Sequence, residues 1–222
     1  MHIKKNVTSI KSEIKSLKEK LNLSYDITIC AATKYVGVKE IKELYDAGIN
    51  NFGENRAQDF LCKQESLHDK DIIWHFIGSL QRNKVKKVIN KISYLHSLDR
   101  ENLAMEINKY RNDILNCYVE VNCSQEISKH GLHPKDVFGF IKKLEKYDKI
   151  KVIGLMTMAE NTDNEDIIRA NFRTLKNIQQ DIRKLNLAYA PCKELSMGMS
   201  NDYLCAIEEG ATIVRIGSRL FR

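Results

Sequence analysis

The feature that most constrains the fold is a repeated alternation of short apolar runs with longer amphipathic segments. A helical pattern follows each of the first seven strand-type runs, as in βαβ units that return the chain to a parallel sheet. The strand-type runs cover residues 27–33, 50–53, 72–78, 92–98, 114–122, 150–158, 194–197 and 212–217. The helical patterns that follow them cover 38–48, 55–65, 80–91, 99–112, 134–147, 163–186 and 200–209.

The two ends of the chain indicate how such a sheet would close. A helix predicted over 7–22 precedes the first strand, whereas the eighth strand ends almost at the C-terminus with no helix after it. If the first helix covers the seam beside the eighth strand, eight strands and eight helices make a closed barrel without sheet edges. We therefore expect an α/β chain, a single-domain (β/α)8 TIM barrel over residues 1–222 with an extra N-terminal helix. An open doubly wound sheet is the alternative.

Charge and hydropathy exclude several classes of function. The chain has 36 basic and 29 acidic residues, a formal net charge of +7, and its densest basic stretch, 82–91, surrounds Val85 and Val88 as the solvated face of a helix would. No window approaches 18 apolar residues, and the N-terminus lacks the apolar stretch of a signal peptide. We expect a cytoplasmic protein with no nucleic-acid or membrane partner.

The cysteines give no sign of a metal site or of disulfides. No two of them are separated by the two to four residues that zinc knuckles and redox pairs need. We expect reduced, mostly buried thiols and no metal. The six lie at positions 30, 62, 117, 123, 192 and 205.

Polar residues gather where the strand-type runs end, which is where a (β/α)8 barrel carries its chemistry. Lys34 directly follows the first run, where we expect an enclosed mouth and poor solvation of its ammonium. Loss of solvation would favour the neutral amine that Schiff-base chemistry needs. The alternative is an ordinary surface lysine at the start of a loop.

The loops after the last two strands are rich in glycine and serine. This fold commonly binds phosphate there through backbone N–H groups. Ser196, Gly198 and Ser200 lie in the seventh loop, and Gly217 and Ser218 in the eighth. Facing a lysine on the first strand, these loops suggest a ligand with a phosphate at one end and a carbonyl at the other.

Arg215 lies on the last strand, two residues before Gly217, and alternation predicts that it points into the barrel. An inward arginine needs an acceptor. One interpretation is an internal salt bridge with Glu54 or Asp99. The other is a guanidinium that donates to a ring nitrogen, which is a known protein partner of a pyridoxal phosphate pyridine.

Four motifs stand in a specific order: FGEN at 52–55, WHFIG at 74–78, LSMGMS at 195–200 and VRIG at 214–217. In this order and spacing the chain, from about residue 27 to its end, resembles the pyridoxal phosphate homeostasis protein family. The resemblance implies a barrel like the N-terminal domain of alanine racemase, with pyridoxal 5′-phosphate (PLP) as its cofactor.

The resemblance also implies roles for individual residues. PLP would form a Schiff base with Lys34, its phosphate would lie against Ser196, Gly217 and Ser218, and its ring nitrogen would face Arg215. Asn55 would lie beside the cofactor. His75 is also counted among the expected cofactor-binding residues, although its role is open and it could instead brace the barrel mouth. Met197, in the LSMGMS motif, is the last residue that we expect at the cofactor. Lys129 matches a family lysine that could receive the cofactor transiently, although an exposed, solvated lysine is the preferred interpretation.

The same residues favour a carrier over a catalyst. Racemisation needs a base on each face of the substrate adduct, and Lys34 is the one obvious base. Tyr35 is expected to turn away on an extended strand, and the sequence, which ends at Arg222, offers no domain that could bring an opposing tyrosine. An arginine at the ring nitrogen also makes a weaker electron sink than a carboxylate.

We therefore expect a PLP-binding protein of cofactor homeostasis and delivery with no catalytic residues. Its expected partners are PLP, apo-enzymes that use PLP, and amino acids, and we expect a monomer. The alternatives are a PLP-dependent amino-acid racemase and a Schiff-base aldolase or other phosphosugar barrel.

Overall fold

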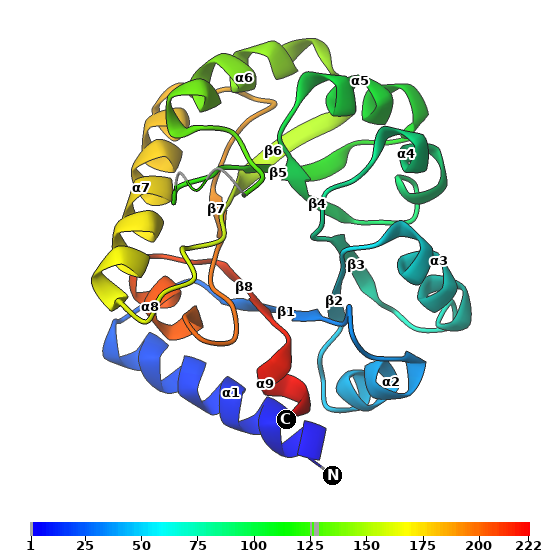
Figure 1. Ribbon diagram of the computed structural model, residues 1–222, viewed down its shortest axis with the longest axis vertical. Helices are drawn as coiled ribbons and strands as arrows, with labels where there is room; N and C mark the ends of the chain where they lie inside the picture. Colours follow the sequence, from blue (N-terminus) through cyan, green and yellow to red (C-terminus); the bar gives the residue numbers. More distant parts are fainter. Residues whose placement is uncertain (1, 125, 127–128) are drawn as a thin grey trace.

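The computed structural model describes residues 2–124, 126 and 129–222. Its strands form a closed parallel barrel in chain order, with the last strand paired to the first (Figure 1). The predicted barrel is therefore confirmed, and the open sheet is wrong. The strands are β1 (Thr28–Ala32), β2 (Asn51–Glu54), β3 (Ile73–Phe76), β4 (Tyr94–Leu98), β5 (Leu115–Glu120), β6 (Ile150–Met156), β7 (Glu194–Ser196) and β8 (Ile213–Ile216).

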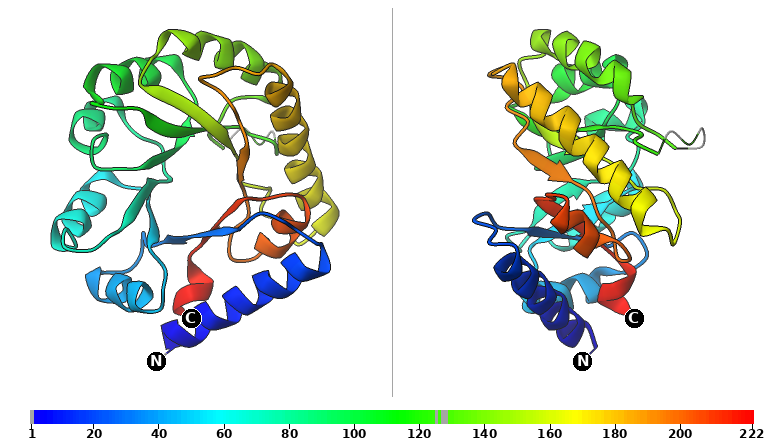
Figure 2. Two further views of the ribbon diagram at one scale, coloured as in Figure 1. Left: turned by 180° about the vertical axis from the view of Figure 1, so that it is seen from behind. Right: turned by 90° about the vertical axis from the view of Figure 1, so that its left-hand side faces the viewer.

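The helices surround this barrel, and each predicted crossover helix is present (Figure 2). The crossover after β5 is less regular than predicted, because a 3-10 turn begins at Pro134 and a second one, Leu144–Lys146, ends the segment. The helices are α1 (His2–Lys20), α2 (Val38–Asp46), α3 (Ala57–Ser66), α4 (Arg82–Val88), α5 (Glu101–Tyr110), α6 (Val137–Lys143), α7 (Glu165–Lys184), α8 (Tyr203–Glu208) and α9 (Ser218–Phe221).

The N-terminal helix α1 covers the seam between β1 and β8, as predicted. It packs against α2, α8 and α9, and the two chain ends lie together in Figure 1. The prediction that no helix follows β8 is wrong, because α9 forms one further turn there. Leu220 anchors this turn in the core, and the side-chain amide of Asn6 donates to the carbonyls of Leu220 and Arg222 at 3.1 and 2.8 Å.

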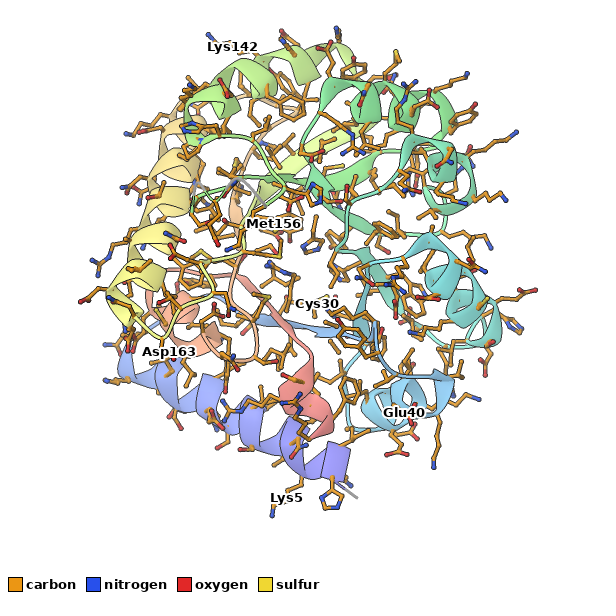
Figure 3. The ribbon with its side chains drawn as sticks, in the orientation of Figure 1. Lys5, Cys30, Glu40, Lys142, Met156 and Asp163 are labelled. Carbon is orange, nitrogen blue, oxygen red and sulfur yellow. The ribbon has the colours of Figure 1, made fainter. Side chains whose placement is uncertain are left out.

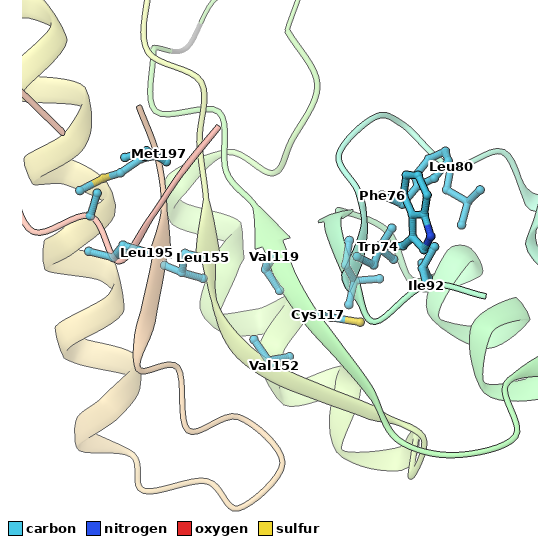
Figure 4. Close-up of a cluster of buried hydrophobic side chains, with 14 of the residues drawn as sticks. Trp74, Phe76, Leu80, Ile92, Cys117, Val119, Val152, Leu155, Leu195 and Met197 are labelled. Carbon is cyan, nitrogen blue, oxygen red and sulfur yellow. The ribbon is translucent and has the colours of Figure 1, made fainter. Parts of the chain in front are cut away.

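Alternation along the strands divides the core into two parts. Outward side chains such as Trp74, Leu155 and Leu195 pack beneath the helices (Figure 4). Inward side chains form a smaller cluster that includes Cys30 and Met156, which lie near the centre of the ring in Figure 3. The barrel interior is therefore filled by side chains, and ligand chemistry is left to its ends.

The basic residues of α4 form its exposed face, with Val85 and Val88 buried beneath it, as predicted for the basic stretch 82–91. Across the described residues, no helix combines the length and apolar character needed to cross a membrane.

Candidate functional site

A cavity of about 710 Å³ lies at the C-terminal end of the barrel, among the loops that follow β1, β6, β7 and β8. It brings together four residues of the predicted set, Lys34, Arg215, Gly217 and Ser218. Asp163, labelled in Figure 3, belongs to its lining from the loop after β6. Residues from the two ends of the chain therefore meet at one cavity, because β1 and β8 are neighbours in the closed sheet.

Lys34 and Tyr35 form the corners of a tight turn. The backbone N–H of Val36 donates to the carbonyl of Thr33 at 3.1 Å, which closes the turn directly after β1. Lys34 is exposed, so the expected poor solvation of its ammonium is wrong. The expectation for Tyr35 is also wrong: its ring lines the same cavity and lies 4.8 Å from Lys34 Nζ. Alternation fails here because the strand has already ended at Ala32.

A buried ion pair fixes the residue that precedes Lys34. Lys63 Nζ, from α3, lies 2.6 Å from Glu54 Oε1 and donates to the Thr33 carbonyl at 2.8 Å. The Thr33 hydroxyl donates to the same carboxylate oxygen at 2.5 Å. Glu54 is fully buried, and its Oε2 has no hydrogen-bond partner among the described residues. The end of β1 is thus held from outside the barrel by a pair that sequence patterning does not reveal.

Ser200 links the two loops at which phosphate binding was predicted. Its Oγ accepts from the backbone N–H of Gly217 at 3.1 Å and of Arg219 at 3.4 Å, and it lines the cavity with Ser218. The sequence analysis assigned Ser200 to this loop but did not include it among the expected cofactor-binding residues. Hydroxyls and backbone donors that converge from two loops are suited to an anion.

The loop after β7 needs glycine at position 198. Gly198 has a φ of 91°, and a Cβ there would lie 2.5 Å from the Cβ of Ala206. Its carbonyl accepts from the backbone N–H of Arg215 at 2.9 Å. This close packing carries the chain from β7 across to β8 and brings Ser200 to the edge of the cavity.

Arg215 points into the barrel, as predicted, and is 5% exposed. Its Nη1 donates to Ser196 Oγ at 2.6 Å, and its Nη2 donates to the Thr157 carbonyl at 2.9 Å. The salt bridge considered for Arg215 is not formed with either proposed acid, because Glu54 pairs with Lys63 and Asp99 pairs with Arg100. The guanidinium is therefore held by neutral acceptors at the base of the cavity.

Glu120 is a buried carboxyl near this end of the barrel. It is the last residue of β5 and is 4% exposed. Burial, together with the nearby charge of Asp99, raises the pKa of Glu120 to about 7, although Arg215 and Arg100 act in the opposite direction. Its protonation state therefore changes near neutral pH.

Four residues of the predicted set, His75, Met197, Asn55 and Ser196, lie away from the cavity lining. His75 is inside the barrel and borders a second cavity of about 280 Å³ at the N-terminal end, so it does not lie at the C-terminal mouth where we expected it. Met197 packs between the barrel and the helices (Figure 4). Asn55 follows β2, and its side-chain oxygen is buried without a hydrogen-bond partner among the described residues.

Ser196 and Lys129 also differ from expectation. Ser196 is fully buried, and its hydroxyl is engaged by Arg215 and His96 inside the barrel, away from the two loops at the mouth. Lys129 is not the solvated lysine that we expected: its Nζ donates to the carbonyl of Ala159 at 2.8 Å and pairs with Glu126. Because Ala159 lines the cavity, Lys129 supports one of its walls.

The geometry has the parts that PLP requires. The amine of Lys34 can meet an aldehyde, the hydroxyls of Ser200 and Ser218 beside Gly217 can meet a dianion, and the guanidinium of Arg215 can meet a ring acceptor. All of these groups line one cavity. The donor set therefore fits this cofactor.

Comparisons with known proteins agree with this geometry. The family model of the alanine racemase N-terminal domain matches residues 6–222. The chain is 44% identical to the pyridoxal phosphate homeostasis protein of Aquifex aeolicus, over 87% of this chain and 85% of that protein. It is 35% identical to the protein of the same name from Schizosaccharomyces pombe, over 88% and 84% of the two chains.

Solved structures give the same result. An unknown protein from Bifidobacterium adolescentis has a TM-score of 0.93 at 32% identity, over 99% of this chain and 94% of that one. PipY of Synechococcus elongatus, solved with PLP bound, has a TM-score of 0.86 at 28% identity, over 99% and 100%. An alanine racemase of Clostridium difficile shares the fold, with a TM-score of 0.78 at 16% identity over 98% of this chain and 56% of the racemase.

The closed barrel and the family match define a barrel of the alanine racemase N-terminal type. Within that class, the chain belongs to the pyridoxal phosphate homeostasis protein family.

Proposed function

We propose that this protein binds PLP reversibly at the C-terminal mouth of its barrel and serves intracellular PLP homeostasis and delivery. The observation that carries the proposal is the single cavity that joins Lys34 to Gly217, Ser218 and the buried Arg215. The names of its relatives and the PLP-bound PipY structure support it. We further propose that the barrel acts as one PLP-binding domain and as a monomer.

Lys34 is the residue that we propose to hold the cofactor covalently. PLP supplies an aldehyde that condenses with an amine. The unprotonated Nζ of Lys34 would form the bond to the aldehyde carbon, and the carbonyl oxygen would leave as water. Because Lys34 is exposed on a turn, water and competing amines can reach this Schiff base. Such access suits a protein that must release its ligand.

The remaining contacts fix the ends of the ligand. We assign the phosphate to the hydroxyls of Ser200 and Ser218 beside the backbone of Gly217, whose N–H holds Ser200 Oγ in place. We assign the ring nitrogen to Arg215, a permanent donor that disfavours protonation of that nitrogen. A ring held in this way is a weak electron sink, which supports a carrier and not an enzyme.

One observation favours a second candidate, a PLP-dependent racemase. Tyr35 lines the same cavity as Lys34, so a second group able to carry a proton lies near the amine. Racemisation would need these two groups on opposite faces of the bound substrate. Both side chains come from adjacent corners of one turn, which favours the carrier.

The cysteines support a cytoplasmic setting for this function. All six are free thiols, which is the state that a reducing compartment maintains. In that setting, the partners that we propose for the loaded protein are apo-enzymes that use PLP and free amino acids.

The proposal is tested by titrating the purified protein with PLP and following the absorbance of the Schiff base. We expect a saturable band in the wild type and its loss in Lys34→Ala. The control is Lys39→Ala, which removes an exposed lysine of α2 and should keep the band. The loaded protein should then reactivate an apo-enzyme. A full band in Lys34→Ala would overturn the site. Sustained turnover of an amino acid at about 1 per second or faster would overturn the carrier role.

A further inference from the structure

A chain of hydrogen bonds crosses the interior of the barrel behind the proposed cofactor site. Arg215 Nη1 donates to Ser196 Oγ at 2.6 Å, and this oxygen lies 2.9 Å from His96 Nδ1. His96 Nε2 lies 2.9 Å from His75 Nδ1, and His75 Nε2 lies 2.9 Å from Asn51 Oδ1. The chain thus links β8, β7, β4, β3 and β2 and runs from the mouth of the barrel to its N-terminal end.

The Asn51 amide fixes the direction of the hydrogen bonds in this chain. Its Oδ1 can only accept, so His75 carries its proton on Nε2, donates it to Asn51, and has Nδ1 free to accept when the ring is neutral. His96 then donates to His75 Nδ1 through its Nε2–H, which leaves His96 Nδ1 as an acceptor. The Ser196 hydroxyl therefore donates to His96 Nδ1, while its Oγ accepts from Arg215, which can only donate. Both histidines are thereby assigned as neutral Nε2–H tautomers.

Packing holds both rings in this arrangement. His75 stacks on Tyr94 with ring centroids 4.6 Å apart, and His96 stacks on Tyr118 with centroids 4.3 Å apart. Both histidines are at most 1% exposed. At the far end, the side-chain N–H of Asn51 donates to Asn50 Oδ1 at 2.8 Å, which turns the Asn51 oxygen toward His75. The chain is therefore rigid and complete.

Electrostatics requires the chain to stay neutral. Arg215 is a buried cation, and protonating either ring would place a second positive charge in the same interior. Burial lowers the pKa of His75 to about 3, and burial with the charges of His75 and Arg215 lowers the pKa of His96 well below its usual range. The chain can therefore transmit orientation at physiological pH without itself becoming charged.

We propose that His96 and His75 are positioning residues that act through Ser196 to fix the Arg215 guanidinium for ligand binding. Ser196, implied by family resemblance as a phosphate ligand, is assigned here to the support of Arg215. The second Arg215 contact, to the Thr157 carbonyl, fixes the plane of the guanidinium. This inference rests on the proposed function, because the group that Arg215 would meet is the ring of PLP.

The test uses two substitutions at His96 in the full chain. Gln offers an acceptor for Ser196 and a donor for His75, so His96→Gln keeps the direction of the chain. Phe retains the stack on Tyr118 but breaks both hydrogen bonds. We expect His96→Phe to raise the Kd for PLP about tenfold and His96→Gln to change it less than about threefold, measured per folded molecule. His68→Gln, at an exposed histidine, is the matched control.

A second readout needs neither a variant nor the ligand. Nitrogen-15 NMR of the wild-type side chains should show two histidines that stay neutral with Nε2–H between pH 5 and 7. An Nδ1–H tautomer at His75 or His96 would overturn the chain. If the wild type binds PLP and His96→Phe binds it equally well, the inference fails and the proposed function stands. If the wild type does not bind PLP, both fail.

Discussion

Acid should destabilise this protein through His75 by an amount that can be worked out from its burial. Burial lowers the pKa of His75 from 6.5 to about 3, so the folded state stays unprotonated where the unfolded chain takes up a proton. The contribution of His75 to the free energy of unfolding is therefore fully present above about pH 6.5 and is lost as the pH falls toward 3. At pH 5 the loss is about 2 kcal/mol, since each pKa unit corresponds to about 1.4 kcal/mol.

The assay is urea unfolding of the wild type and of His75→Gln at pH 7 and pH 5. Other groups also titrate in this range, so the quantity of interest is the difference between the two proteins. The wild type should lose about 2 kcal/mol more than the variant on going to pH 5. His68→Gln, at an exposed position, should behave like the wild type. Equal losses in the wild type and His75→Gln would refute the reasoning that His75 is buried in its neutral form.

Three further predictions concern stability. Lys63→Met leaves the Glu54 carboxylate buried without its partner and should cost about 3–5 kcal/mol in chemical unfolding, much of it restored by adding Glu54→Gln. Because the pKa of Glu120 is raised to about 7, the contribution of Glu120 to stability should fall as the pH rises from 4 to 8, so the stability of Glu120→Gln relative to the wild type should grow by about 3 kcal/mol over that range. Gly154→Ala, whose Cβ would lie 2.2 Å from the Glu194 carbonyl oxygen, should lower the melting temperature sharply, whereas Gly139→Ala, with nothing within 4 Å, should raise it slightly.

The barrel could be predicted because its strands and helices repeat with two distinct periods and because the two ends of the chain complement each other. The differences arise where a segment is too short to show a period. The single turn of α9 is one case, held by Leu220 and by the distant Asn6. The segment predicted as a helix over 134–147 differs for another reason, because Pro134 starts a 3-10 turn and a second 3-10 turn, Leu144–Lys146, ends it.

The site was predictable where a residue follows a strand directly. Lys34, Gly217 and Ser218 meet in one cavity because they lie at the ends of adjacent strands. The orientation of the Tyr35 side chain was predicted wrongly. The in-and-out alternation of strand residues was applied to position 35, but β1 ends at Ala32 and Tyr35 lies in a turn.

The interior chain was not predictable in the same way. His96 and Ser196 are 100 residues apart in sequence and meet across the barrel. Their partnership depends on the register of four strands. The inward positions of polar residues on β3, β4, β7 and β8 were the available signal.

The central claim is that PLP is held by the amine of Lys34. The most direct measurement is to incubate the protein with PLP, reduce the adduct with borohydride and map the modified lysine by peptide mass spectrometry. The account predicts one dominant modification, on the peptide that contains Lys34, and its loss when excess inorganic phosphate competes for the Gly217 and Ser218 loop. Dominant modification of another lysine, such as Lys63 or Lys129, would contradict it.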